Sequence, residues 1–130
     1  MSVEKWDPDI HLPLVCKWLS GWGLEHIVDP DMYPPTGFVV DDCAAGFIYS
    51  TNAPSVAYID NLITDSSANP RIRYSAIGRL TQALLQMADD MGIRLIMGTS
   101  NIRGVIRICE ARGFKVYDKG YELIARMKGT

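Results

Sequence analysis

The middle of the chain holds the residues with the clearest potential for chemistry. An apolar segment at Val56–Thr64 predicts a strand, and Arg73-Tyr74-Ser75-Ala76-Ile77-Gly78 then leads into a long amphipathic helix. A loop of small residues at a helix N-terminus presents unpaired backbone N–H groups and the positive end of the helix dipole. Arg71 and Arg79, together with Arg73, add formal charge around the same point. This pattern predicts a binding site for an anion such as phosphate.

Charge is divided unevenly along the chain, although the net charge is only −2. Residues 1–65 contain ten acidic and two basic side chains, a balance of −8, whereas residues 66–130 contain five acidic and eleven basic ones, a balance of +6. Such a division can reflect two ligands of opposite sign, an anion at the C-terminal half and a cation at the N-terminal half. Accidental surface composition would produce the same division.

The length of 130 residues suits one domain, 1–130, with an ordinary core. Hydrophobic residues make up 48% and charged residues 22%, which is typical of a soluble globular protein. No apolar run approaches the roughly 20 residues that a membrane helix needs. The first residues include acids where a secretory signal would be basic, so we expect a cytoplasmic location and no membrane partner.

The three cysteines, Cys16, Cys43 and Cys109, lie far apart in the sequence. This spacing fits neither a paired disulfide framework nor a zinc site, and His11 and His26 do not complete one. We therefore expect no metal, and we expect each cysteine to be a small buried apolar group.

The N-terminal half predicts one helix followed by an antiparallel meander. Helical spacing of apolar residues predicts a helix over about Leu12–Trp22, after which Gly23–Pro35 is expected to be an irregular loop. Trp6, Trp18 and Trp22 could line an aromatic cleft that binds an amine through cation–π contact. Because Trp18 and Trp22 share the apolar face of this helix, core packing is favoured for them, and Tyr33 is the preferred aromatic residue of a cleft. The three strands of the meander are Gly37–Val40, Ala45–Ser50 and Val56–Thr64.

The C-terminal half predicts two further helices. Apolar residues keep helical spacing from Ile77 to Met91, where Gly92 ends the helix, and Ile93–Gly98 follows as a strand that can pair in parallel. Ser100 or Asn101 can cap the next helix, which ends at Gly113. A final hairpin is expected from Lys115–Tyr117 and Tyr121–Met127.

This order of elements resembles the GNAT superfamily of acyl-CoA N-acyltransferases over nearly the whole chain. The family's pyrophosphate loop, Gln/Arg-x-x-Gly-x-Gly/Ala, is matched by Arg73–Gly78 with Ala76 at the first glycine, and a second match is Asn101 followed by Gly113-Phe114. The resemblance implies an α+β fold of the three-layer α/β type. It implies a central mixed, mostly antiparallel sheet of about six to seven strands, flanked by three to four helices.

The same resemblance implies acetyl-CoA as cofactor. Backbone N–H groups of Ser75–Gly78 would bind its pyrophosphate and the nearby arginines would neutralise charge, although Tyr74 is bulkier than the family's usual residue. The pantetheine arm would lie along the strand edge at Asn61–Thr64, where an N–H near Leu62 or Ile63 could polarise the thioester carbonyl. The expected cofactor-binding residues are Leu62, Ile63, Thr64, Arg71, Arg73, Tyr74, Ser75, Ala76, Ile77, Gly78, Arg79 and Asn101.

Three residues are candidates for catalysis. Asp60 stands where many relatives carry a glutamate and would deprotonate the amine, although a solvent-facing strand residue explains it equally; Asp65 is second choice and fits a turn. Asn101 would face the pantetheine or the reacting centre. Cys109 occupies the position of the tyrosine that protonates the leaving thiolate in many relatives, whereas a cysteine on an apolar helical face is more often part of the core.

These residues support one leading function and one alternative, and a third class is weaker. The first is an N-acetyltransferase that moves an acetyl group from acetyl-CoA to a primary amine of an unidentified small molecule or protein. The second is a catalytically impaired GNAT-like module that binds CoA or serves a structural role. Nucleic-acid binding is not expected, because the chain is acidic overall and its arginines fall on several elements. A homodimer formed through the last strands is compatible with the sequence.

Overall fold

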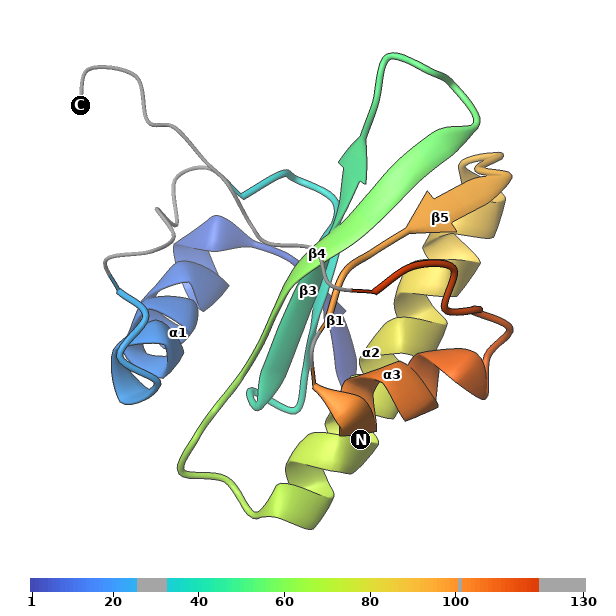
Figure 1. Ribbon diagram of the computed structural model, residues 1–130. Coiled ribbons are helices and arrows are strands. Elements are labelled where there is room, and N and C mark those ends of the chain that lie inside the picture. The colour runs from blue at the N-terminus through green and yellow to red at the C-terminus, as the bar shows by residue number, and fades with distance from the viewer. Residues whose placement is uncertain (26–32, 101, 120–130) are drawn as a thin grey trace, which may run out of the picture.

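The computed structural model describes residues 1–25, 33–100 and 102–119, and the following applies to these residues. Their strands form one sheet in the order β1-β2-β3-β4-β5. One layer on the sheet is helix α1, and the layer on the opposite face is formed by α2 with α3 packed against it (Figure 1). The elements are β1 (Val3–Lys5), α1 (Pro8–Gly21), β2 (Gly37–Val40), β3 (Ala44–Ser50), β4 (Val56–Thr64), α2 (Pro70–Asp90), β5 (Leu95–Met97) and α3 (Arg103–Glu110).

The sheet confirms the predicted meander and the predicted parallel neighbour. Strands β2, β3 and β4 pair antiparallel in sequence order, and β5 pairs parallel with β4. Strand β1 was not predicted, because its three residues are all exposed and show no alternation of apolar and polar side chains. It pairs antiparallel with β2 and forms one edge of the sheet.

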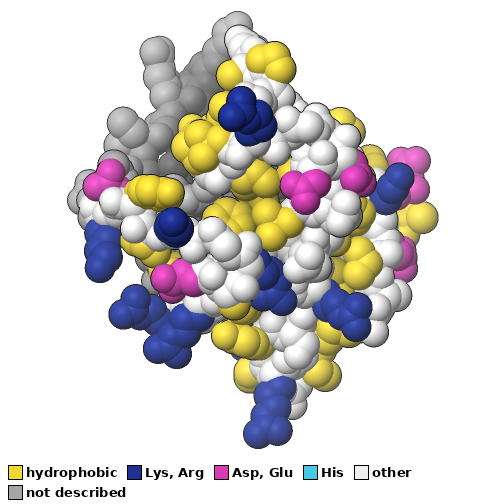
Figure 2. Space-filling model, turned by 90° about the vertical axis from the view of Figure 1, so that its right-hand side faces the viewer, with side chains coloured by type: hydrophobic (Ala, Val, Ile, Leu, Met, Phe, Trp, Pro, Cys, Tyr) yellow, Lys and Arg dark blue, Asp and Glu magenta, His cyan; other side chains and the backbone are white. Residues whose placement is uncertain are grey.

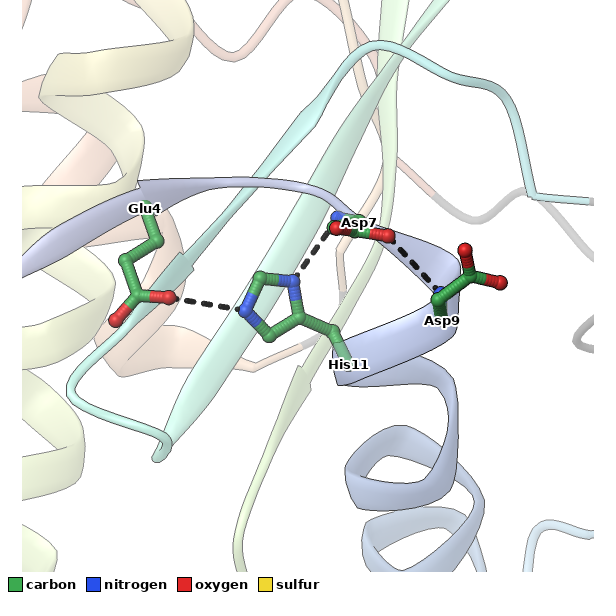
Figure 3. Close-up of polar contacts among 4 residues, drawn as sticks. All are labelled: Glu4, Asp7, Asp9 and His11. Carbon is green, nitrogen blue, oxygen red and sulfur yellow. Dashed lines mark hydrogen bonds and ion pairs between the residues drawn. The ribbon is translucent and has the colours of Figure 1, made fainter.

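Helix α1 begins four residues earlier than predicted because Asp7 and Pro8 form its start. The Asp7 carboxylate accepts a hydrogen bond from the Asp9 N–H at 3.0 Å, and Pro8 occupies the first helical position, where no N–H is needed. His11 ties this start to β1 (Figure 3). Its Nδ1 accepts from the Asp7 N–H at 3.0 Å, and its Nε2 lies 3.1 Å from the Glu4 carboxylate. This buried histidine therefore has a structural role.

The core consists of two clusters, one on each face of the sheet. On the α2 face, Leu80 and Leu84 pack against Ile48 of β3, as the helical spacing predicts. On the α1 face, Val15 and Trp18 pack among residues that include Phe47 of β3. Trp22 departs from the prediction. It lies just after α1 and is 46% exposed.

The C-terminal part of the described chain differs most from the prediction. Phe114–Lys119 has no regular secondary structure, so the predicted strand Lys115–Tyr117 is not formed there, and its expected partner Tyr121–Met127 lies outside the described residues. The described chain thus has five strands and three helices, against an expected six to seven and three to four. The mixed α+β class is confirmed. Among these helices, none is long and apolar enough to cross a membrane.

Candidate functional site

Strands β4 and β5 run together for only three residues and then part. Val56, Ala57 and Tyr58 pair with β5, whereas β4 continues to Thr64. Just beyond the paired part, Gly98 still lies close to β4, since a Cβ built on Gly98 would be 3.1 Å from the Ile59 carbonyl oxygen. Figure 1 shows β4 extending well past the short β5. In the described structure, the last residues of β4 therefore have a strand neighbour on the β3 side alone.

The same part of β4 contains a bulge. Asp60 pairs with Phe47 and Ile63 pairs with Ala45, so Asn61 and Leu62 together face the single residue Gly46 of β3. Asn61 has a φ of 55°, which lies in the left-handed region. An inserted residue of this kind leaves the ladder locally unpaired and changes the direction of the backbone groups that follow.

The ladder after the bulge fixes the direction of each amide. The Asp65 N–H donates to the Cys43 carbonyl at 2.8 Å, and in an antiparallel pair successive residues point alternately toward and away from the partner strand. The Ile63 amide N–H therefore points toward β3, whereas the N–H groups of Leu62 and Thr64 point away from it. The Thr64 carbonyl agrees with this assignment, because it accepts from the Trp22 indole N–H at 2.7 Å. Of the two predicted donors, the geometry favours Leu62.

The prediction that Arg73–Gly78 forms a phosphate-binding loop is wrong in its secondary structure. Helix α2 begins at Pro70, so the whole run Arg73–Gly78 is helical, and its N–H groups from Tyr74 onward donate to carbonyls four residues earlier. Asn69 caps the helix, since its side chain accepts from the Arg71 N–H at 2.9 Å and its carbonyl accepts from the Arg73 N–H at 3.0 Å. Ala76 and Gly78 are buried. The N–H groups of Ser75–Gly78 therefore form no anion cradle in this structure.

The arginines around the start of α2 have different environments. Arg71 and Arg79 are exposed, whereas Arg73 donates to the Ser66 carbonyl at 2.9 Å and lies 5.5 Å from the Trp22 ring centre. Arg103 and Arg107 of α3 are also exposed. In Figure 2, most basic side chains lie in the lower half of the face formed by β5, α2 and α3. The N-terminal ends of α2 and α3, which include Arg71 and Arg103, therefore have the positive charge that an anionic ligand requires.

Tyr74 contributes to packing between these helices. Its ring lies against α3, where a Cβ built on Gly104 would be 3.3 Å from the Tyr74 ring. The side chain is still 50% exposed. Tyr74 thus joins α2 to α3, which differs from the predicted role beside a phosphate.

Polar groups gather on the α1 face next to the bulge. Asp60 is exposed, and its Oδ1 accepts from the Asn61 N–H at 2.7 Å. The Asn61 side-chain amide donates to the Tyr49 hydroxyl, and burial raises the pKa of Tyr49. Tyr33 stacks on Phe47 with ring centres 4.4 Å apart, and burial raises its pKa to about 12. The candidate base Asp60 therefore lies close to the neutral phenol of Tyr49 and is exposed to solvent.

The remaining predicted residues have separate positions. Asp65 accepts from the Ser67 N–H and hydroxyl at 2.9 and 2.7 Å, and these bonds hold its pKa below the usual range, as suits a turn residue. Cys109 lies on α3, half-buried, and burial raises its pKa, so the thiol is protonated at neutral pH. No contact joins Cys109 to Asp60 in the described structure. Asn101 lies outside the described residues.

Sequence reasoning missed Tyr49 and the special conformation of Asn61. The signal for Asn61 was present, because asparagine is depleted in strands and tolerates the left-handed region better than most residues. Tyr49 carries no such signal. Its role depends on the register between β3 and β4, which only the folded chain shows.

No family model and no curated protein matches the sequence. Solved structures match its fold: a protein from Agrobacterium tumefaciens assigned as an acetyltransferase has a TM-score of 0.69 and 15% identity, with 96% of this chain and 100% of that chain covered. An aminoglycoside acetyltransferase from an uncultured soil metagenomic sample has a TM-score of 0.66 and 9% identity, covering 98% and 96%. A transcriptional regulator from Bacillus halodurans has a TM-score of 0.65 and 14% identity, covering 95% and 99%. The chain has the fold of the GNAT acetyltransferases.

Proposed function

We propose that the protein is an N-acetyltransferase that moves an acetyl group from acetyl-CoA to a primary amine. The observation that carries this proposal is the part of β4 beyond its pairing with β5, which contains the bulge, and from this register we infer that the Leu62 amide points away from β3. An N–H group fixed in this way can stabilise the negative charge that develops on a carbonyl oxygen during acyl transfer. The shared fold with solved acetyltransferases supports the same reading.

The residues fit coenzyme A in part. The exposed Arg71 and Arg79 suit its phosphates, and the β4 edge around Leu62 suits the amide groups of its pantetheine arm. The helical backbone at Ser75–Gly78 does not fit, because its N–H groups are used within α2. When bound, the cofactor would supply the acetyl group as an activated thioester.

Two side chains of the chain would handle protons. The Asp60 carboxylate has its Oδ1 engaged by the Asn61 N–H, so its Oδ2 is the atom that would take a proton from an ammonium group. The Cys109 thiol, which burial keeps protonated, would donate from its Sγ to the leaving sulfur. The exposed position of Asp60 allows either a direct transfer or one through water.

A second candidate is a non-catalytic GNAT-like module that binds a partner or CoA without acetyl transfer. The helical Ser75–Gly78 segment favours it, because the N–H groups of this segment are used within α2 and form no phosphate cradle there. The regulator from Bacillus halodurans shows that proteins of this fold are also described by roles other than acetyl transfer.

Thermal unfolding with acetyl-CoA, CoA or sulfate distinguishes these functions. A ligand at 100 times its Kd stabilises the folded chain by about 2.7 kcal/mol, so an acetyltransferase should melt at a higher temperature with either CoA species and show less effect with sulfate. No shift with acetyl-CoA at millimolar concentration would remove the proposed cofactor.

Mass spectrometry of amines incubated with acetyl-CoA then tests the reaction, with aminoglycosides, polyamines and lysine peptides in the panel. Asp60→Asn should lower the rate at least about 100-fold, as expected for the loss of a general base. The matched control is Asp42→Asn in the β2–β3 turn, where asparagine tolerates the left-handed φ of 47°. Binding of acetyl-CoA without acetylation of any amine would favour the non-catalytic module.

A further inference from the structure

Asn61 has a backbone conformation that a strand does not normally contain. Its φ of 55° is uncommon for a residue with a Cβ, and it occurs within β4 rather than in a turn. Such conformations persist where surrounding contacts hold them, and they are concentrated at functional sites. The contacts that hold Asn61 in this conformation therefore point to a functional role.

Two hydrogen bonds hold this conformation, one at each end of the residue. The Asn61 backbone N–H donates to the Asp60 carboxylate at 2.7 Å, and the Asn61 side-chain amide donates to the Tyr49 hydroxyl. Tyr49 belongs to the neighbouring strand β3, where it pairs opposite Tyr58 and is half-buried. The second bond thus connects the bulge to a fixed point on the next strand.

The bulge decides where the Leu62 amide points. Ile63 now pairs with Ala45 and faces β3. Without the extra residue, Leu62 would take the place opposite Ala45, and its N–H would bond into β3. The Leu62 side chain supports the present register, since it packs so closely over Gly46 that a Cβ there would lie 2.5 Å from Leu62 Cδ2.

We propose that Tyr49 and Asn61 are positioning residues that hold the β4 bulge and so keep the Leu62 amide directed at the reacting carbonyl. This inference rests on the proposed acetyl transfer. Neither residue needs to touch the acetyl group, because each acts through the backbone of Leu62. The exposed arginines of α2 and α3 are not part of this arrangement.

The test compares Tyr49→Phe and Asn61→Gly with Tyr58→Phe as the matched control. Tyr49→Phe removes the hydroxyl alone, and Asn61→Gly removes the side-chain amide while tolerating a positive φ. Tyr58→Phe makes the same chemical change at a residue directly opposite Tyr49 that is 44% exposed. Two quantities are measured: steady-state kinetics with acetyl-CoA and an accepted amine, and amide hydrogen exchange at Ile63.

Both test variants should lower kcat about 10-fold, less than the loss of an oxyanion donor itself, with KM for acetyl-CoA within about 2-fold of the original. Exchange at Ile63 should become about 10-fold faster, while exchange at Leu84 in the α2 core stays unchanged and shows that the chain is folded. Tyr58→Phe should change neither quantity.

If Tyr49→Phe, like the control Tyr58→Phe, changes neither kcat nor the hydrogen exchange at Ile63, the proposal is overturned. Faster Ile63 exchange with unchanged kcat would equally overturn the positioning role. If the unmodified chain acetylates no amine, the proposed function fails on its own, and unchanged exchange at Ile63 would then reject the hydrogen-bonded bulge independently.

Discussion

Tyr33 and Tyr49 are phenols held in the space between α1 and the sheet. Burial raises the pKa of both; at Tyr49 the hydrogen bond from Asn61 opposes this effect and the nearby Asp60 adds to it. A phenol that stays neutral can donate or accept a hydrogen bond without bringing a charge close to Asp60. At the scale of single residues, the described surroundings of Asp60 on the α1 face therefore include the neutral phenol of Tyr49.

The raised pKa of Tyr33 predicts a specific alkaline behaviour. Because its pKa is about 12 in the folded chain against 10.0 ordinarily, the folded chain keeps a proton that the unfolded chain loses. Its contribution to the free energy of unfolding is fully present below about pH 10 and falls by about 2 kcal/mol as the pH approaches 12. In a spectrophotometric titration of tyrosinate, Tyr33→Phe should remove a component near pH 12. Tyr117→Phe, which changes an 85% exposed side chain, should leave that component in place.

The sequence could identify Asp60 and Leu62 as candidates but could not choose between Leu62 and Ile63. That choice depends on one inserted residue, which reverses the direction of every later amide in the strand. The printed sequence shows Asn61 as a polar residue between Asp60 and Leu62, and its residue type alone does not fix its conformation. Its left-handed conformation follows from contacts with Asp60 and with Tyr49, twelve positions earlier in the chain.

At the scale of elements, the start of α2 has the largest consequence. Sequence comparison with a family pattern placed a loop at Arg73–Gly78, whereas local capping rules would have started the helix at Asn69-Pro70. The apolar stripe of Leu80, Leu84 and Ala88 was predictable from helical periodicity alone. A stripe of this kind determines which face is buried but leaves the first turn of the helix undetermined.

The capping role of Asn69 predicts a measurable loss of stability. Asn69→Ala removes the acceptor for the Arg71 N–H and should lower the free energy of unfolding by about 1 kcal/mol in urea denaturation. Asn52→Ala, in the exposed turn between β3 and β4, is the matched control and should change stability by less than about 0.5 kcal/mol. Equal stability of the two variants would show that residues near Pro70 are not helical in solution.

At the scale of the whole molecule, Trp22 joins the two helical layers around the end of β4. Its indole N–H donates to the Thr64 carbonyl, and Arg73 of α2 lies over its ring while donating to the Ser66 carbonyl. This cluster links the end of α1 to the start of α2 through the β4–α2 connection. The helical period predicted that Trp22 packs in the core, and this prediction was wrong: its indole bonds to the Thr64 carbonyl and its ring lies beneath Arg73.

Because Trp22 contacts both helical layers, a small change of its side chain should lower the free energy of unfolding of the whole domain. Trp22→Phe keeps an aromatic ring but loses the N–H, and it should lower the free energy of unfolding by about 1 kcal/mol in urea denaturation. The control Ile10→Ala alters a side chain on α1 that is 62% exposed and should have little effect. A Trp22→Phe variant as stable as the original chain would mean that the bond to Thr64 contributes nothing in water.

Strand β1 has a consequence for how molecules of this protein meet one another. It covers the outer edge of β2, whose Gly37-Phe38-Val39-Val40 sequence is buried and apolar and would otherwise be open to pairing with another chain. A three-residue edge strand that includes Glu4 and Lys5 is a poor template for such pairing, because it is short and charged. The first few residues thus protect the sheet against aggregation, and shortening the chain at its N-terminus would expose a strand suited to polymerise.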